Sequence, residues 1–218
     1  MLLFLAPSKV SAHSTYNFQT VSEGQVDEAL LRLVPVRFLN SHPLYFLIWA
    51  KENVTRFFKP SAARKAEFDT IVAGKKLKES YLLLKEGDVK NSGRTLASYG
   101  KRLDKMVDGL ERARSQNQDV SSLVDLMAEN LRVHETMFFA IQKEWELMED
   151  DYNFDSDFAG AVSSHARAVL AIDNVKPGLR DRFTTVGKEA TQEANPAPYP
   201  TPYVQEATPS VKPKRVIL

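Results

Sequence analysis

Hydrophobic residues recur at steps of three and four along most of the chain between residues 41 and 187. This spacing places the side chains on one face of a helix, and no stretch alternates cleanly enough to predict a β-strand. Amphipathic helices joined by short polar turns bury their apolar faces by packing side by side. We therefore expect an all-α fold, an up-and-down bundle of about four to five helices built on a long antiparallel helical hairpin.

Prolines, glycines and capping residues mark the expected helix ends. Pro43 predicts a short helix over about 43–58, because proline suits the first turn of a helix. Pro60 then begins a long helix that Gly87 ends, and Asp88 begins a third helix of similar length. The second and third helices should form the hairpin.

Two further helices are expected after the hairpin. The fourth starts at Asp119 or Ser121 and carries the longest regular apolar pattern of the chain, as far as Met148. An acidic turn over 150–157 separates it from a fifth helix over about 158–176.

The flanking regions have a different composition. Residues 1–12 combine an apolar run with a small-residue triplet that ends at Ala12, a pattern that resembles the end of a secretory signal. Residues 13–40 form an expected N-terminal extension with a short helix, and residues 41–187 the helical bundle domain. Residues 188–218 are rich in proline and predict a disordered tail. We expect an exported protein of the cell envelope or a secreted one.

Composition and charge exclude several classes of function. The 29 Lys and Arg residues nearly balance the 28 Asp and Glu residues, so the chain lacks the basic excess of a nucleic-acid binder. The absence of cysteine excludes disulfides, thiolate nucleophiles and Cys-ligated metals. No Gly-rich phosphate-binding motif occurs, and no cofactor is expected. No apolar run is long enough for a transmembrane helix, so any envelope association would also use segments beyond the given termini.

The segment from Ser41 to about Ala113 carries a recognisable series of short motifs. These are His-Pro-Leu-Tyr-Phe-Leu at 42–47, Lys-Glu-Asn-Val at 51–54, Phe-Phe at 57–58, Lys-Ala-Glu at 65–67 and Lys-Leu-Lys-Glu at 76–79. The pattern resembles domain of unknown function number 5667, an uncharacterised bacterial and archaeal family whose members are typically exported. Two departures are Asn40 in place of the family's first proline, and Gly and Lys within 73–79 in place of the usual Glu and Arg.

This resemblance implies export and an all-helical hairpin. It transfers no catalytic residue, because the family has no established activity. Within the shared segment, Leu44, Tyr45 and Leu47 are expected to anchor the first helix on the hairpin through aromatic and aliphatic burial.

Oxygen-bearing side chains alternate along the acidic turn in the way a calcium loop requires. The sixth and twelfth positions depart from that loop, because they carry Ser156 and Val162 instead of Gly and Glu. The alternative is a solvated turn whose carboxylates cap the next helix. The candidate calcium ligands are Asp151, Asn153, Asp155 and Asp157.

Two histidines, His134 and His165, fall on apolar helix faces. If their helices pack together, the two rings meet and, with Asn130 or an acidic neighbour, would hold zinc. The alternative is a buried polar pair that forms hydrogen bonds inside the bundle.

Other polar clusters give no catalytic constellation. No Gly-x-Ser-x-Gly motif occurs, and no Ser lies near a His in a recurrent pattern. The basic runs Lys75-Lys76-Lys78 and Lys101-Arg102-Lys105 are expected to be ordinary solvated helix faces.

The first predicted helix carries more aromatic residues than one side of a short helix can bury. Either this helix is sandwiched between other elements, or part of its aromatic surface stays exposed and forms a docking surface for a protein partner or a second copy. The aromatic residues are Tyr45, Phe46, Trp49, Phe57 and Phe58.

Together these features predict an exported, non-catalytic helical interaction or structural module at the cell envelope. The alternative is an extracytoplasmic protein that binds or senses a metal ion, calcium at the acidic turn or zinc at the paired histidines.

Overall fold

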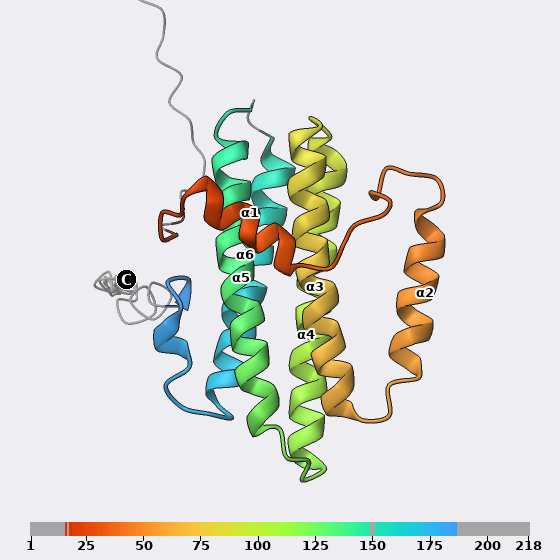
Figure 1. The fold of residues 1–218 in the computed structure, drawn as a ribbon, viewed down its shortest axis with the longest axis vertical. Helices are drawn as coiled ribbons and strands as arrows, with labels where there is room; N and C mark the ends of the chain where they lie inside the picture. The colour runs from red at the N-terminus through yellow and green to blue at the C-terminus, as the bar shows by residue number, and fades with distance from the viewer. Residues whose placement is uncertain (1–15, 17, 149–150, 187–218) are drawn as a thin grey trace, which may run out of the picture.

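The computed structural model describes residue 16 and residues 18–148 and 151–186. These residues form six α-helices and one short 3-10 helix, and no strand occurs among them (Figure 1). The all-α class expected from the sequence is therefore confirmed for this part of the chain. The predicted leader (1–12) and the predicted tail (188–218) lie outside the described residues.

Four long helices form a bundle, with two shorter helices outside it. The elements are α1 (Glu23–Arg32), α2 (Tyr45–Phe57), α3 (Ala62–Lys85), α4 (Val89–Ser115), α5 (Ser121–Trp145), α6 (Tyr152–Asp173) and η1 (Arg180–Arg182).

The bundle helices α3 to α6 alternate in direction along the chain, but α4 and α5 are not neighbours. α3 packs on α4 and α5, and α6 packs on α4 and α5, so the link between α4 and α5 crosses one end of the bundle diagonally (Figure 1). As a consequence the neighbours α3 and α5 run parallel. α1 crosses the outside of α5, and α2 stands at the edge of the bundle beside α3.

Capping side chains explain where the long helices begin. The hydroxyl of Ser61 accepts a hydrogen bond from the Arg64 amide at the start of α3, and the carboxylate of Asp88 accepts one from Asn91 at the start of α4. Gly87, at a φ of +79°, makes the tight turn between α3 and α4, in a backbone conformation that other residues rarely adopt.

The predicted apolar faces form the core of the bundle. Leu77, Leu103, Met137 and Ile172, one from each long helix, are all fully buried. Burial of a side chain of this size stabilises the folded state by about 1.5–3 kcal/mol. The core therefore follows from the spacing of hydrophobic residues that the sequence shows.

The acidic segment before α6 differs from the expected turn, because α6 begins at Tyr152 and not near Phe158. Asp151 caps this helix: its Oδ1 accepts hydrogen bonds from the amides of Asn153 and Phe154 at 2.8 and 3.3 Å. A carboxylate cap together with Asp155 in the first turn is favourable at the positive end of the helix dipole. The acidic residues therefore begin a helix early.

Candidate functional site

α2 contacts the bundle through a polar face. Its inward-facing side chains include Tyr45, Glu52 and Arg56, which meet α3 and α4. The spacing of 45, 52 and 56 places all three on one side of a helix with 3.6 residues per turn. A helix that packs on a protein core usually presents apolar residues on this side, so α2 is inverted.

A chain of seven alternating charges runs from α2 into α3 and α4; with Tyr45 we call it the charge network. Asp69 of α3 lies at its first branch. The Asp69 carboxylate accepts hydrogen bonds from Arg56 Nε at 2.7 Å and from Arg102 Nη1 of α4 at 3.2 Å. The other guanidinium arm of Arg102 lies 3.3 Å from Glu52. Arg102 therefore joins one carboxylate of α3 to one of α2. The seven charged residues are Arg56, Asp69, Arg102, Glu52, Lys75, Glu79 and Lys76.

The second half of the charge network centres on Glu79. Lys75 Nζ lies 2.7 Å from Glu52 and 3.4 Å from Glu79, and Lys76 Nζ lies 2.8 Å from Glu79. The phenol of Tyr45 donates to Glu79 at 2.7 Å, and Lys76 also contacts the Tyr45 hydroxyl and ring. Burial, together with the neighbouring Glu79 carboxylate, raises the pKa of Tyr45, so the phenol stays protonated and remains a donor.

Most of the charge network is buried, which corrects the expectation for two basic runs. Lys75, Lys76 and Arg102 are each less than a tenth exposed, and the Asp69 and Glu79 side chains are fully buried. Carboxylates on α2 and α3 take the place of the water that would otherwise surround these basic side chains. Only part of each run fits the expected solvated face.

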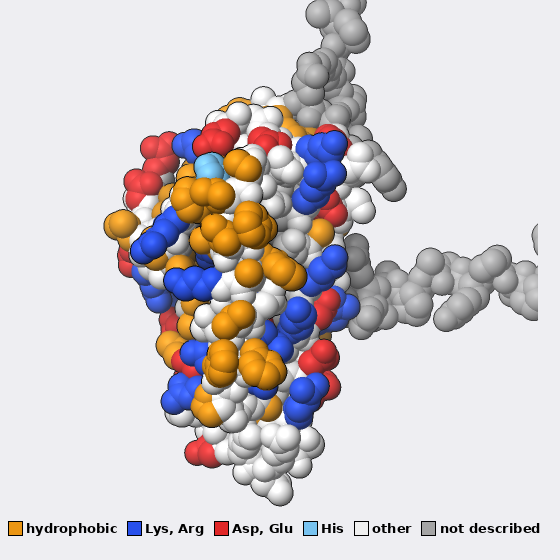
Figure 2. Space-filling view, turned by 90° about the vertical axis from the view of Figure 1, so that its right-hand side faces the viewer, with side chains coloured by type: hydrophobic (Ala, Val, Ile, Leu, Met, Phe, Trp, Pro, Cys, Tyr) orange, Lys and Arg blue, Asp and Glu red, His pale blue; other side chains and the backbone are white. Residues whose placement is uncertain are grey.

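The outer face of α2 is apolar and open to solvent. Phe57 and Phe58 are each 76% exposed, and Figure 2 shows hydrophobic side chains along the middle of this side of the molecule, with Lys and Arg interspersed with Asp and Glu on both flanks. The sandwiched arrangement is therefore wrong for these side chains. Leu44 and Leu47 are exposed as well, so only Tyr45 of the three expected anchors points inward, and it does so through its hydroxyl. The exposed apolar residues are Leu44, Phe46, Leu47, Trp49, Val54, Phe57 and Phe58.

A groove of about 510 Å³ lies between α2 and α4, beside the charge network. Trp49 and Phe46 line it from α2, and Lys101 and Lys105 line it from α4. Its lining contains one carboxylate, Glu52, which is already paired with Lys75 and Arg102. The groove therefore combines aromatic surface with uncompensated positive charge.

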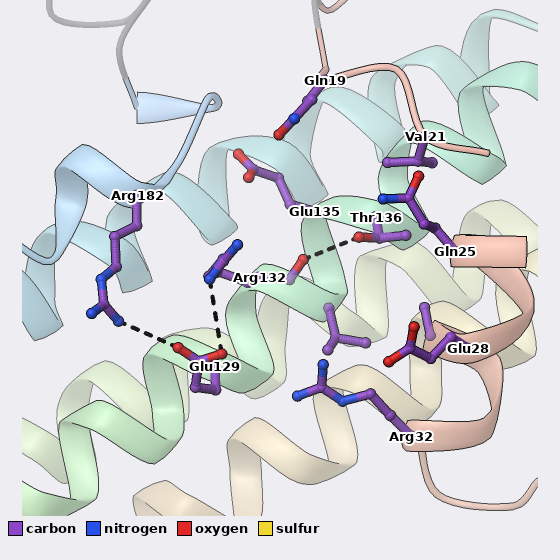
Figure 3. A pocket seen from close by; sticks show the side chains of 12 residues that line it. Gln19, Val21, Gln25, Glu28, Arg32, Glu129, Arg132, Glu135, Thr136 and Arg182 are labelled. Carbon is purple, nitrogen blue, oxygen red and sulfur yellow. Dashed lines mark hydrogen bonds and ion pairs between the residues drawn. The ribbon is translucent and has the colours of Figure 1, made fainter.

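A second cleft, of about 220 Å³, separates α1 from α5 (Figure 3). Arg32, Arg132 and Arg182 line it, together with the carboxylates of Glu28, Glu129 and Glu135. Most of these groups serve the fold. Glu129 lies near both Arg132 and Arg182, at 4.0 and 3.3 Å. Glu135 accepts hydrogen bonds from the backbone amides of residues 184 and 185 and so holds the segment after η1 on α5.

The proposed calcium ligands lie on a helix and its cap. Successive residues of a helix turn by about 100°, so residues two apart point in widely different directions. Asp151 caps α6, Asp155 accepts a hydrogen bond from Trp145 Nε1 at 2.9 Å, and Asp157 lies against Gly93 of α4. Burial raises the pKa of Asp157, and nearby Asp151 adds to this effect. In the described part of the chain no three His, Asp or Glu side chains gather in a way that would hold a metal ion.

The two predicted histidines meet in the centre of the bundle, with ring centroids 6.4 Å apart. His165 donates Nε2–H to the Leu131 carbonyl at 3.0 Å, and the Thr185 hydroxyl donates to its Nδ1 at 3.2 Å. His134 lies 3.4 Å from the Tyr99 hydroxyl and faces Gly74, where an added Cβ would come within 2.5 Å of its Nε2. Burial lowers the pKa of both histidines, so the pair is neutral.

Sequence reasoning found the aromatic residues of α2 but missed the charge network. Its one sequence signal is the inverted pattern of α2, where Glu52 and Arg56 share the side that an ordinary amphipathic helix makes apolar. Asp69 and Arg102 gave no signal, because their partners lie on other helices. The short motifs of the resemblance do include Tyr45, Glu52, Lys76 and Glu79, all members of the charge network.

None of the described helices is both long and apolar enough to cross a membrane. Comparison of the chain with models of known families, with curated proteins and with solved structures gives no significant match.

Proposed function

We propose that this protein is an exported, non-catalytic interaction module of the cell envelope and that the outer face of α2 is its contact surface. The observation that carries the proposal is the inversion of α2, with Glu52 and Arg56 inside and Phe57 and Phe58 outside. Exposed large aromatic side chains gathered on one element are typical of a surface that becomes buried against a partner. The leader-like residues 1–12 support export.

Two features favour binding over catalysis. The buried carboxylates Glu52, Asp69 and Glu79 are all engaged by cations of the charge network. The buried pair of histidines is held neutral inside the bundle, and neither ring lines either cleft. Groups of this kind position helices, whereas a general acid or base needs access to a substrate.

Site-specific photocrosslinking in the cells that make the protein tests this function. A photoreactive phenylalanine analogue replaces Phe57 in one variant and Leu147, which is 79% exposed on the turn after α5, in a matched control. We expect adducts at position 57 and few at position 147. Equal yields at both positions would overturn α2 as the contact surface.

A further inference from the structure

We infer that the partner of the α2 outer face is the surface of an anionic lipid bilayer, on which α2 lies with its long axis parallel to the membrane plane. This inference rests on the proposed function, because it names the partner of the same surface. An amphipathic helix binds a lipid surface when its apolar face enters the boundary between headgroups and acyl chains and basic residues flank that face.

The apolar residues of α2 point in one direction. With 3.6 residues per turn, Phe46, Leu47, Val54 and Phe57 fall on the side opposite Glu52, and Phe58 follows at the end of the helix. The ion pairs of Glu52 and Arg56 fix the rotation of the helix, so these side chains cannot turn into the bundle without burying unpaired charge. The outer face of α2 therefore always points away from the bundle.

The flanks of this face carry free positive charge. Lys51 lies on α2 beside the apolar residues, and Lys101 and Lys105 lie on α4 across the groove. All three are exposed, and none forms an ion pair within the described residues. Each basic residue held near an anionic membrane adds electrostatic attraction to the burial of apolar surface.

The charge around the surface favours a bilayer over a protein. Extending the contact over the flanks would bury lysines, which protein interfaces avoid. Two copies meeting through this face would also bring like charges together.

Vesicle flotation with the full chain tests the inference. The probes are vesicles of phosphatidylcholine mixed with phosphatidylglycerol and vesicles of phosphatidylcholine alone. We expect binding to the anionic vesicles, reduced at least about tenfold by the double substitution Phe57→Ser and Phe58→Ser, because two rings lose their burial. The matched control replaces Leu31 and Leu147, which are 85% and 79% exposed on other elements, by Ser and should bind normally.

A second pair of variants tests whether the lysines beside the groove contribute to lipid binding. Lys101→Glu with Lys105→Glu should weaken binding to anionic vesicles about tenfold, because two attractions become repulsions. Arg114→Glu with Lys143→Glu makes the same change in net charge elsewhere and should have little effect. Circular dichroism and the thermal midpoint confirm that each variant is folded.

Three outcomes would overturn the lipid assignment. These are no binding of the unmodified chain to anionic vesicles, equal loss in test and control variants, and a dimer in sedimentation that the Phe57→Ser and Phe58→Ser chain no longer forms. The last outcome, or a discrete protein adduct at position 57 in the crosslinking experiment, would remove the lipid surface as partner but leave the proposed function standing.

Discussion

The bundle core and the α2 interface are built on opposite principles. In the core, Leu77, Leu103 and Met137 exclude water, and a few polar side chains such as Tyr99, the two histidines and the Ser80–Ser92 pair lie among them. At the α2 interface the polar groups lie inside and the apolar groups outside. Apolar packing tolerates small changes of geometry, whereas a buried ion pair is favourable only when each partner is in place. The core therefore supplies stability, and the charge network fixes the position and rotation of one helix.

The largest effect is expected from breaking the charge network at Asp69. Asp69→Ala leaves Arg56 and Arg102 without their shared carboxylate and should lower the free energy of unfolding by about 3–5 kcal/mol. Denaturant unfolding measures this loss. The matched control is Asp125→Ala, which removes a half-exposed pair with Lys176 and should cost at most about 1 kcal/mol. Similar losses in both variants would mean that the ion pairs of Asp69 contribute no more to stability than a half-exposed ion pair does.

A slightly smaller effect is expected from a cavity in the core. Leu103 is fully buried, so Leu103→Ala should lower the free energy of unfolding by roughly 2–5 kcal/mol, through lost burial and the cavity left behind. The same denaturant titration measures it. A loss below about 0.5 kcal/mol would show that the apolar face of α4 is wrongly assigned.

The third prediction is a pH dependence of stability that comes from the two histidines of the bundle core. The pKa values of His134 and His165 are lowered in the folded state, so the unfolded chain binds more protons below pH ~6.5. Stability should be constant between about pH 7.5 and pH 9 and fall as the pH drops through about 6.5, by at most about 1.4 kcal/mol per histidine per pH unit. Replacing either histidine by Asn should reduce this slope. A stability that rises on acidification would contradict the neutral pair.

The smallest effect on stability is expected at the outer face of α2. Phe57→Ser with Phe58→Ser removes two large apolar side chains that are mostly in water, so the free energy of unfolding should change by no more than about 0.5 kcal/mol. Thermal and denaturant unfolding measure this change. A loss of about 2 kcal/mol or more would place these rings in the core of the free protein and remove the contrast between the regions.

The sequence predicted the core well because its signal is local. Steps of three and four along α3 and α4 identified Leu77, Leu103 and Met106, which are all buried. The predicted start of α6 was wrong, because the acidic residues were interpreted as a turn, whereas Asp151 caps the helix and Asp155 lies in its first turn. The charge network could not be predicted, since Arg102 meets Asp69 and Glu52 only through the packing of three helices. The aromatic residues of α2 were recognised, but which of them stay exposed depends on how the charge network rotates the helix.

The most direct test uses the two tryptophans, one in each region. Trp49 on α2 is 61% exposed and Trp145 in the core is 2% exposed. Trp145→Phe leaves Trp49 as the fluorophore, and Trp49→Phe leaves Trp145, so acrylamide quenching compares the regions in otherwise identical chains. We predict strong quenching of Trp49, weak quenching of Trp145, and protection of Trp49 by anionic vesicles. Equal protection of both tryptophans in the free protein would contradict the account, because α2 would then be covered like the core.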